Sequence, residues 1–301
     1  MKILVTGGAG FIGKHIVNYL LKKKYTVTIF DNFSNSKKDS IVDLIKLGAK
    51  VIEGDIKKIE DIQNACIGQN TVVHLAAKIS VPESIKNPIE TFENNVDGTK
   101  NVLIASKKNN VKKIIAASSA AVYGKSDPNV KLTEDFQMNP ISPYGDSKRK
   151  MELEIKKFAV KNNVSCTILR FFNIYGIGQT PEYSGVITKF IERIKENKSL
   201  IIFGDGLQTR DFIAIDDVVE SIHNAILSSK SGTYNIASGE ITTIKEIAEL
   251  MISIKGIKID IEYTEELKGD IRNSHADISL AKKEINYFPK CKIDKIKQLL
   301  E

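Results

Sequence analysis

A tyrosine and a lysine four residues apart, Tyr144 and Lys148, have the side-chain types and the spacing that proton transfer requires. Ser142 is a typical helix N-cap and Pro143 suits the first helical position. Both side chains are therefore expected on one helix face, about 6 Å apart along its axis. A phenol with an ordinary pKa of about 10 is a base near neutrality only if that pKa falls by roughly three units, or about 4 kcal/mol. A neighbouring ammonium favours the phenolate, so the pair predicts acid–base chemistry, with a chance surface pair as the alternative.

Two serines, Ser118 and Ser119, end the β-branched run that begins at Lys113. A serine hydroxyl at a strand end beside a tyrosine base can hydrogen-bond a substrate hydroxyl and relay its proton. We therefore expect the serines and the tyrosine to form one site.

A glycine-rich turn follows the first apolar run, residues 2–6, and matches both GxGxxG and GxxGxxG through Gly7, Gly8, Gly10 and Gly13. Such a turn needs glycine because a side chain would keep a pyrophosphate away from the backbone N–H groups that open the next helix. A tight turn without a ligand is the alternative. The turn lies between a predicted strand and an amphipathic helix, which favours dinucleotide binding.

Acidic and small residues end the next predicted strands. Asp31 closes the second strand about twenty residues after the turn, where a carboxylate accepts hydrogen bonds from ribose hydroxyls. It would repel a 2′-phosphate, which favours NAD over NADP, although Lys37 and Lys38 lie nearby. Asp55 follows the third strand and could bond the adenine amino group, and the small residues 75–77 would let a flat cofactor lie against the fourth. Ordinary loop polarity is the alternative for each, but ligands of open α/β sheets bind at these strand ends.

These residues depend on a regular alternation of strands and helices. Short β-branched runs predict strands at 2–6, 26–30, 50–53, 71–75, 113–117 and 165–171, and segments of helical period such as 13–23 and 98–108 separate them. This alternation predicts a parallel sheet covered on both faces. The expected fold class is α/β, a Rossmann-like doubly wound parallel sheet with a smaller α+β C-terminal substrate domain.

The rhythm changes after about Tyr175, where glycine and proline interrupt the chain. An amphipathic segment at 186–196 and a strand at 200–203 follow, and the stretch 233–237 could return to the main sheet. We therefore expect an NAD-binding Rossmann domain of residues 1–172 plus 212–238, and a substrate domain of residues 173–211 and 239–301.

The composition is that of a folded globular protein, with 42% hydrophobic and 27% charged residues among 301. The net charge of +7 comes mainly from dispersed lysines, without the basic stripe and interleaved aromatic residues of a nucleic-acid partner. No run of about 18 apolar residues predicts a membrane span. Three cysteines without a CxxC pair fit a reducing cytoplasm, and four histidines without paired spacing predict no metal site.

With the glycine turn, Asp31, Asp55, the serines and the Tyr144/Lys148 pair in this order, the chain resembles the extended short-chain dehydrogenase/reductase family, from residue 2 to about residue 288. It is most similar to NAD-dependent nucleotide-sugar epimerases of the UDP-glucose/UDP-N-acetylglucosamine 4-epimerase type. The resemblance implies that Ser119 and Tyr144 act on the sugar 4-hydroxyl, and that Lys148 binds the nicotinamide ribose and lowers the tyrosine pKa. It implies NAD contacts from Gly7, Gly10, Phe11, Ile12, Gly13, Asp31, Asn32, Asn35, Ser36, Asp55, Ile56, Leu75, Ala76, Ala77, Asn94, Ser118, Tyr144, Lys148 and Phe172. It implies substrate contacts from Ser80, Ser119, Tyr144, Asn173, Val186, Ile202, Phe203, Arg210, Asp270, Arg272 and Ser274.

Four positions bear on the reaction and the substrate that the resemblance implies. Relatives that dehydrate or decarboxylate the sugar carry an acid where this chain has Ala120 and Ala121, which favours plain 4-epimerisation. Ser274 falls where epimerases place a size gate beside the sugar C2 substituent, and a small residue there suggests room for N-acetyl sugars. Many relatives have an arginine where this chain has Leu267, so Lys268 or Arg272 could bind the diphosphate instead.

The resemblance therefore implies 4-epimerisation of a UDP-hexose, with UDP-GlcNAc/UDP-GalNAc as the expected substrates and UDP-Glc/UDP-Gal as further ones. The reaction would pass through a transient 4-keto sugar, with hydride returned to either face. A homodimer built on a pair of helices is usual for this family. The alternatives are a nucleotide-sugar dehydrogenase or reductase with net redox turnover, and a non-catalytic NAD-binding module.

Overall fold

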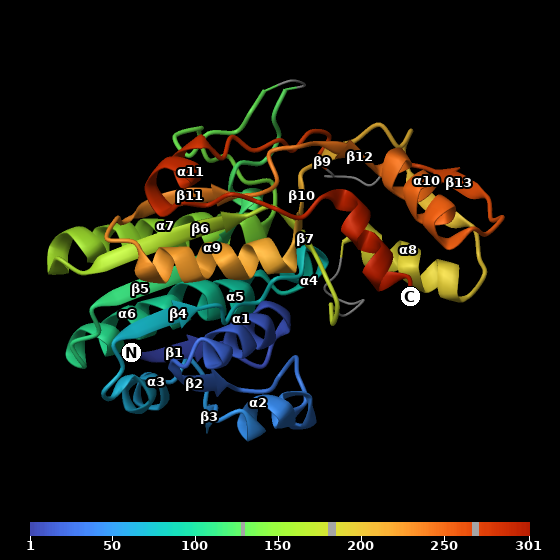
Figure 1. Ribbon diagram of the computed structural model, residues 1–301. Helices are drawn as coiled ribbons and strands as arrows, with labels where there is room; N and C mark the ends of the chain where they lie inside the picture. The colour runs from blue at the N-terminus through green and yellow to red at the C-terminus, as the bar shows by residue number, and fades with distance from the viewer. Residues whose placement is uncertain (128–129, 180–184, 267–270) are drawn as a thin grey trace.

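The computed structural model describes residues 1–127, 130–179, 185–266 and 271–301. A seven-stranded sheet forms its centre, as Figure 1 shows. Every neighbouring pair of strands in this sheet is parallel, in the order β11-β6-β5-β4-β1-β2-β3. The strands are β1 (Lys2–Thr6), β2 (Thr26–Asp31), β3 (Lys50–Glu53), β4 (Thr71–His74), β5 (Lys113–Ser119), β6 (Ser165–Phe171) and β11 (Gly232–Ile236). The predicted α/β class is confirmed, and the stretch near residue 233 does return to the sheet.

Helices cover both faces of the sheet because alternate strand residues point to opposite sides. Ile3 and Val5 pack under one helical layer, whereas Leu4 packs under the other. The first layer contains α1 (Phe11–Lys22), α2 (Val42–Lys46), α9 (Ile215–Leu227) and α11 (Ser279–Ile285). The second contains α3 (Ile59–Cys66), α6 (Gly98–Lys108) and α7 (Pro143–Asn162).

Strand order reverses beside β1, because β2 and β3 lie to one side of it and β4, β5, β6 and β11 to the other. In a doubly wound sheet this reversal opens a crevice beyond the carboxyl ends of the strands, and ligands bind there. Short elements lie between β4 and α6: α4 (Val81–Lys86), α5 (Pro88–Phe92) and a π-helical turn, η2 (Glu93–Asp97), which contributes Asn94 to the crevice. Two 3₁₀ turns, η1 (Lys38–Ile41) and η3 (Ala120–Val122), follow β2 and β5.

A separate apolar core lies beyond this crevice, at the right of Figure 1. It packs α8 (Val186–Lys195) and α10 (Ile244–Lys255) against β8 (Leu200–Phe203), β13 (Ile261–Thr264) and the C-terminal 3₁₀ helix η5 (Ile293–Leu299). A capping box starts α10, since Thr243 and Glu246 bond each other's backbone N–H groups. Three two-stranded sheets complete this part: β8 with β13, β7 (Asn173–Tyr175) with β10 (Phe212–Ala214), and β9 (Thr209–Arg210) with β12 (Thr242–Thr243).

None of the helices in the described ranges combines the length and the apolar character that crossing a lipid bilayer demands. Within the same ranges, no three His, Cys, Asp or Glu side chains gather in a way that could hold a metal ion.

Candidate active site

A cleft of about 1080 Å³ lies at the carboxyl ends of the central strands. It brings together residues that are far apart in the chain, from the glycine turn after β1 to the start of α8. The sequence-predicted residues that line it are Gly7, Gly10, Phe11, Ile12, Gly13, Asp31, Asn32, Asn35, Ser36, Ile56, Leu75, Ala76, Ala77, Asn94, Ser118, Ser119, Tyr144, Lys148, Phe172, Asn173 and Val186. One continuous cleft thus contains the predicted cofactor contacts and the predicted reactive groups.

The start of α7 places the tyrosine and the lysine in this cleft. The Ser142 hydroxyl accepts a hydrogen bond from Gly145 N at 3.1 Å and Pro143 occupies the first turn, so the predicted N-cap is confirmed. Lys148 is buried, and its Nζ donates to the carbonyl oxygen of Ala117 at 2.9 Å. This bond ties α7 to the end of β5, directly before the two serines.

The two reactive groups have shifted pKa values. Burial lowers the pKa of Lys148 to about 8, and the negative charge of Glu152 opposes this shift. Burial also raises the pKa of Tyr144, while its hydrogen-bonding interaction with Ser119 lowers it. In the protein alone, desolvation of the Tyr144 phenol outweighs the other effects, and the role of Lys148 in lowering the tyrosine pKa remains a prediction.

The glycine turn has two different requirements for glycine. A Cβ atom on Gly13 would lie 2.2 Å from the carbonyl oxygen of Gly7, and one on Gly7 would lie 2.7 Å from Ala76 N. Gly7 also has a φ of +69°, a backbone conformation that residues with a side chain rarely adopt. A Cβ on Gly10 would meet only the Gly7 carbonyl, at 3.2 Å, and would otherwise project into open space. Gly7 and Gly13 thus need to be glycine for close packing, whereas Gly10 needs to be glycine to keep the cleft open.

Two buried polar atoms in the cleft lack a partner in the described structure: Asn94 Oδ1 and Ser36 Oγ. Buried polar atoms normally have hydrogen-bond partners, so these two are suited to a polar ligand. Asp31 lies near Ser36 in the chain and accepts hydrogen bonds from Ala9 N at 3.0 Å and Phe33 N at 2.9 Å. The open turn, the acidic strand end and the orphaned atoms fit a dinucleotide that extends along the cleft.

Several predicted residues have protein partners and do not line the cleft. The Asp55 carboxylate accepts from Lys57 N at 2.8 Å and from Asn32 Nδ2 at 3.4 Å. The Ser80 hydroxyl caps α4 by accepting from Glu83 N at 3.2 Å. Their predicted ligand contacts remain predictions.

On the substrate side, Ile202 is buried in the separate apolar core, and Phe203 follows it at the end of β8. Arg272 forms a bidentate ion pair with Asp205, with both N–O distances 2.6 Å. Arg210 donates to the carbonyl oxygen of Thr209 at 2.8 Å, and Ser274 is buried. Three further positions named in the sequence predictions, Leu267, Lys268 and Asp270, lie outside the described residues.

Asn95, which was not among the predicted site residues, organises the site from the π-helical turn. Its Oδ1 accepts from Lys78 N at 2.8 Å, and its Nδ2 donates to Lys78 O and Ser147 Oγ, both at 2.9 Å. One amide thus joins the loop after β4 to the first turns of α7. Asparagine is unfavourable inside helices, so the Asn94-Asn95 pair within a helical pattern was the available signal.

A buried histidine supports the same region. His74 bonds Thr6 Oγ1 at 2.7 Å through Nδ1 and Thr99 Oγ1 at 2.9 Å through Nε2. Burial lowers the pKa of His74 to about 3, so the ring is neutral. These contacts connect β4 with β1 and α6 beneath the cleft, so His74 has a structural role.

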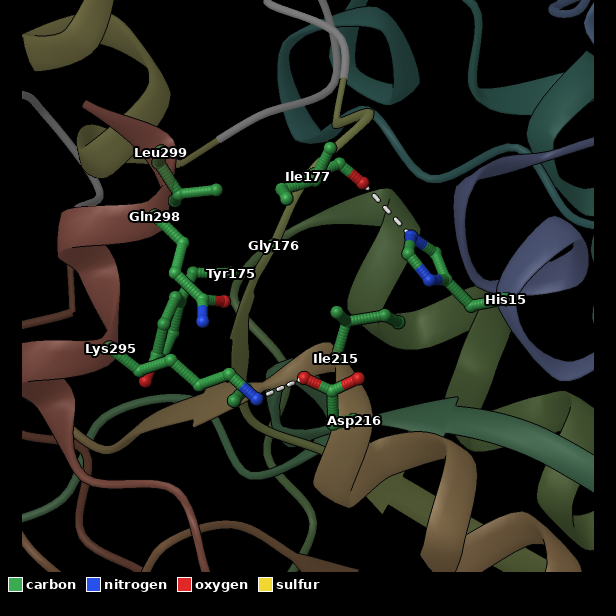
Figure 2. A pocket seen from close by; sticks show the side chains of 10 residues that line it. His15, Tyr175, Gly176, Ile177, Ile215, Asp216, Lys295, Gln298 and Leu299 are labelled. Atoms are coloured by element: carbon green, nitrogen blue, oxygen red, sulfur yellow. Dashed lines mark hydrogen bonds and ion pairs between the residues drawn. The ribbon is translucent and has the colours of Figure 1, made fainter. Parts of the chain in front are cut away.

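A second cavity of about 130 Å³ lies where the segment after β7 passes between α1 and η5 (Figure 2). His15 Nε2 is 2.9 Å from the carbonyl oxygen of Ile177, and Lys295 pairs with Asp216 on the other side. The His15 contact fixes segment 175–177, which continues to Gly178 and Gln179 at the main cleft.

Comparison with known proteins agrees with this geometry. Residues 3–237 match the NAD dependent epimerase/dehydratase family. A UDP-N-acetylglucosamine 4-epimerase from Methanobrevibacter ruminantium M1, in complex with UDP-N-acetylmuramic acid, has a TM-score of 0.92 and 36% identity over 100% of this chain and 96% of its own. The UDP-glucose 4-epimerase of Thermotoga maritima with UDP-glucose has a TM-score of 0.94 and 34% identity, covering 100% and 97%. A UDP-glucose 4-epimerase from Corynebacterium glutamicum is 30% identical over 304 residues, 96% of this chain and 91% of that protein.

The chain belongs to the NAD dependent epimerase/dehydratase family. Its cofactor is NAD, as the glycine turn and Asp31 predicted. The resemblance inferred from the motifs is confirmed.

Proposed function

We propose that this chain is an NAD-dependent UDP-sugar 4-epimerase that takes UDP-GlcNAc and UDP-GalNAc, and also UDP-Glc and UDP-Gal. One observation supports the proposal most directly. Tyr144, one helical turn before the buried Lys148, faces the same cleft as Ser119 and the glycine turn. Proton transfer and dinucleotide binding are thus available at one point.

Bound NAD supplies hydride acceptance and return at its nicotinamide ring. The residues supply the proton chemistry. Tyr144, as the phenolate, takes the proton of the sugar 4-hydroxyl, directly or through the Ser119 hydroxyl. Lys148 Nζ donates to Ala117 O and to Met151 Sδ, so one of its three N–H donors is left for the nicotinamide ribose. Because burial raises the pKa of Tyr144, its ionisation relies on the positive charges of the ammonium and the nicotinamide ring.

Epimerisation also requires that the 4-keto sugar rotate and present its other face while its nucleotide end stays fixed. Asn173 lines the cleft and is our candidate for a diphosphate contact, together with Arg210. Binding energy at this end is remote from C4, so it can retain the intermediate without discriminating between the two C4 configurations. Val186, Ile202, Phe203 and Ser80 are further proposed substrate contacts.

The proposed substrate range follows from the small Ser274 at the expected size gate. It is also supported by relatives whose names include both UDP-glucose and UDP-N-acetylglucosamine 4-epimerases. Replacing Ser274 with tyrosine should reduce turnover of N-acetyl substrates more than that of UDP-Glc. Equal losses would remove this argument.

The direct test incubates purified protein separately with UDP-Glc and UDP-GlcNAc and resolves the products by chromatography. Formation of the C4 epimers, without accumulation of NADH absorbance, supports epimerisation. Steady NADH formation would instead support a net dehydrogenase. Tyr144→Phe should lower kcat by about 10²–10⁴-fold with NAD retained, and unchanged turnover would contradict the role of Tyr144.

We further propose the division into an NAD-binding part, residues 1–172 plus 212–238, and a substrate part, residues 173–211 and 239–301. We propose a cytoplasmic homodimer that pairs α6 and α7 with their copies. Helices α6 and α7 pack side by side and carry the exposed Ile104, Leu153 and Val160, which supports the dimer. The described cysteines are free thiols, which supports the cytoplasmic location. Ile104→Glu should give monomers in sedimentation velocity, and a monomeric wild type would contradict the proposal.

A further inference from the structure

Asp211 is a buried carboxylate at the junction of three segments on the substrate side of the cleft. Its Oδ1 accepts hydrogen bonds from Ser238 N at 2.8 Å and Ser238 Oγ at 2.6 Å. Its Oδ2 accepts from Gly239 N at 3.0 Å and Ala276 N at 3.4 Å. The side chain is fully buried, so the carboxylate has exchanged water for these donors, which stabilise it only while all three segments stay together.

The backbone of Asp211 connects this junction to the cleft. Its carbonyl oxygen accepts from Asn173 N at 3.1 Å, and the next residue, Phe212, lines the cleft together with Asn173. The preceding residue is Arg210, on the short strand β9. Any movement of Asp211 is therefore transmitted to both proposed diphosphate contacts.

The side chain of Asp211 also holds the segment that carries Ser274. Beyond Ala276 N, this segment is fixed by His275, whose Nε2 is 3.1 Å from Gly239 O and whose carbonyl oxygen accepts from Leu132 N at 2.8 Å. Gly239 therefore has contacts with both Asp211 and His275. The junction thus links the proposed diphosphate contacts with the proposed size gate.

We propose that Asp211 is a positioning residue for substrate binding: it fixes Arg210 and Asn173 relative to the segment that carries Ser274. This inference rests on the proposed function, because it assumes a nucleoside diphosphate at Arg210 and Asn173. If Asp211 has a purely structural role, its replacement should lower stability and NAD content. If it positions the substrate contacts, its replacement should lower the affinity for the nucleotide end of the substrate and leave kcat nearly unchanged.

The test uses Asp211→Asn and the milder Ser238→Ala, which removes the 2.6 Å bond and keeps the carboxylate. UDP is the binding probe in calorimetry, and KM and kcat are measured with UDP-Glc and UDP-GlcNAc. Asp216→Asn is the matched control, since Asp216 is an exposed carboxylate that pairs with Lys295. We expect the Kd of UDP and both KM values to rise about tenfold in Asp211→Asn and about threefold in Ser238→Ala. The kcat values should stay within about twofold, and the control should match the wild type.

The outcomes separate this inference from the proposed function. If the wild type binds UDP and epimerises UDP-sugars while both variants bind UDP equally well, only the role of Asp211 is overturned. A fall in kcat and NAD content at unchanged Kd for UDP would likewise overturn it. Failure of the wild type to bind UDP would overturn the proposed function and this inference together.

Discussion

Glu152 and Arg170 form a buried bidentate ion pair beneath α7, with Nε 2.9 Å from Oε1 and Nη2 2.7 Å from Oε2. Glu152 is 0% exposed and Arg170 is 1% exposed. Ser118 Oγ donates to the same Oε1 at 2.6 Å, so its proton is directed away from the cleft and its lone pairs remain available there. Glu152 lies one turn after Lys148, and its negative charge favours the protonated form of the Lys148 amine.

The pair predicts a non-additive effect on stability. Glu152→Gln should lower the free energy of unfolding by about 3–5 kcal/mol, because it leaves the Arg170 charge buried without its partner. The double variant Glu152→Gln/Arg170→Met should recover most of this loss, since both charges are then absent. Urea unfolding of the wild type, the single variant and the double variant measures these free energies of unfolding. A double variant as unstable as the single one would contradict this account.

The ion pair matters for catalysis through the charge of Lys148. Because burial lowers the pKa of Lys148 to about 8, its amine is protonated below that pH and neutral above it. A neutral amine no longer favours the Tyr144 phenolate. We therefore expect kcat/KM to fall as pH rises through about 8. In Lys148→Arg the fall of kcat/KM at alkaline pH, the alkaline limb of the profile, should be absent, since a guanidinium stays charged. Its kcat should be lower than that of the wild type. The same alkaline limb in both proteins would assign it to another group.

How much the sequence predicts depends on how local each interaction is. The glycine turn and the N-cap at Ser142 involve neighbours in the chain, and residue type determines them. Asn95 and Ser147 meet across 52 positions, and no local pattern indicates that contact. Motif position also fails to reveal competing partners: Ser80 caps a helix and Arg272 pairs with Asp205.

Asn94 allows cofactor binding to be separated from folding. Its buried Oδ1 has no partner in the described structure, so Asn94→Ala removes no protein contact of that atom and should leave the melting temperature of the NAD-free protein nearly unchanged. It should weaken NAD binding by about one hydrogen bond, or about tenfold in Kd. Thermal shift with increasing NAD measures both quantities. An unchanged Kd would show that Asn94 Oδ1 does not bind the dinucleotide.

The two requirements for glycine in the turn make a matched pair of variants. In Gly13→Ala the new Cβ would lie 2.2 Å from a backbone oxygen, a distance that forces the turn and α1 apart, so we expect a strongly destabilised protein. In Gly10→Ala the new Cβ meets one atom at 3.2 Å and otherwise enters the cleft. That protein should fold with a nearly normal melting temperature and bind NAD at least tenfold more weakly, because a methyl group now occupies the path of the pyrophosphate. Circular dichroism and NAD titration distinguish the two effects. Normal NAD affinity in Gly10→Ala would mean that the dinucleotide does not approach the turn.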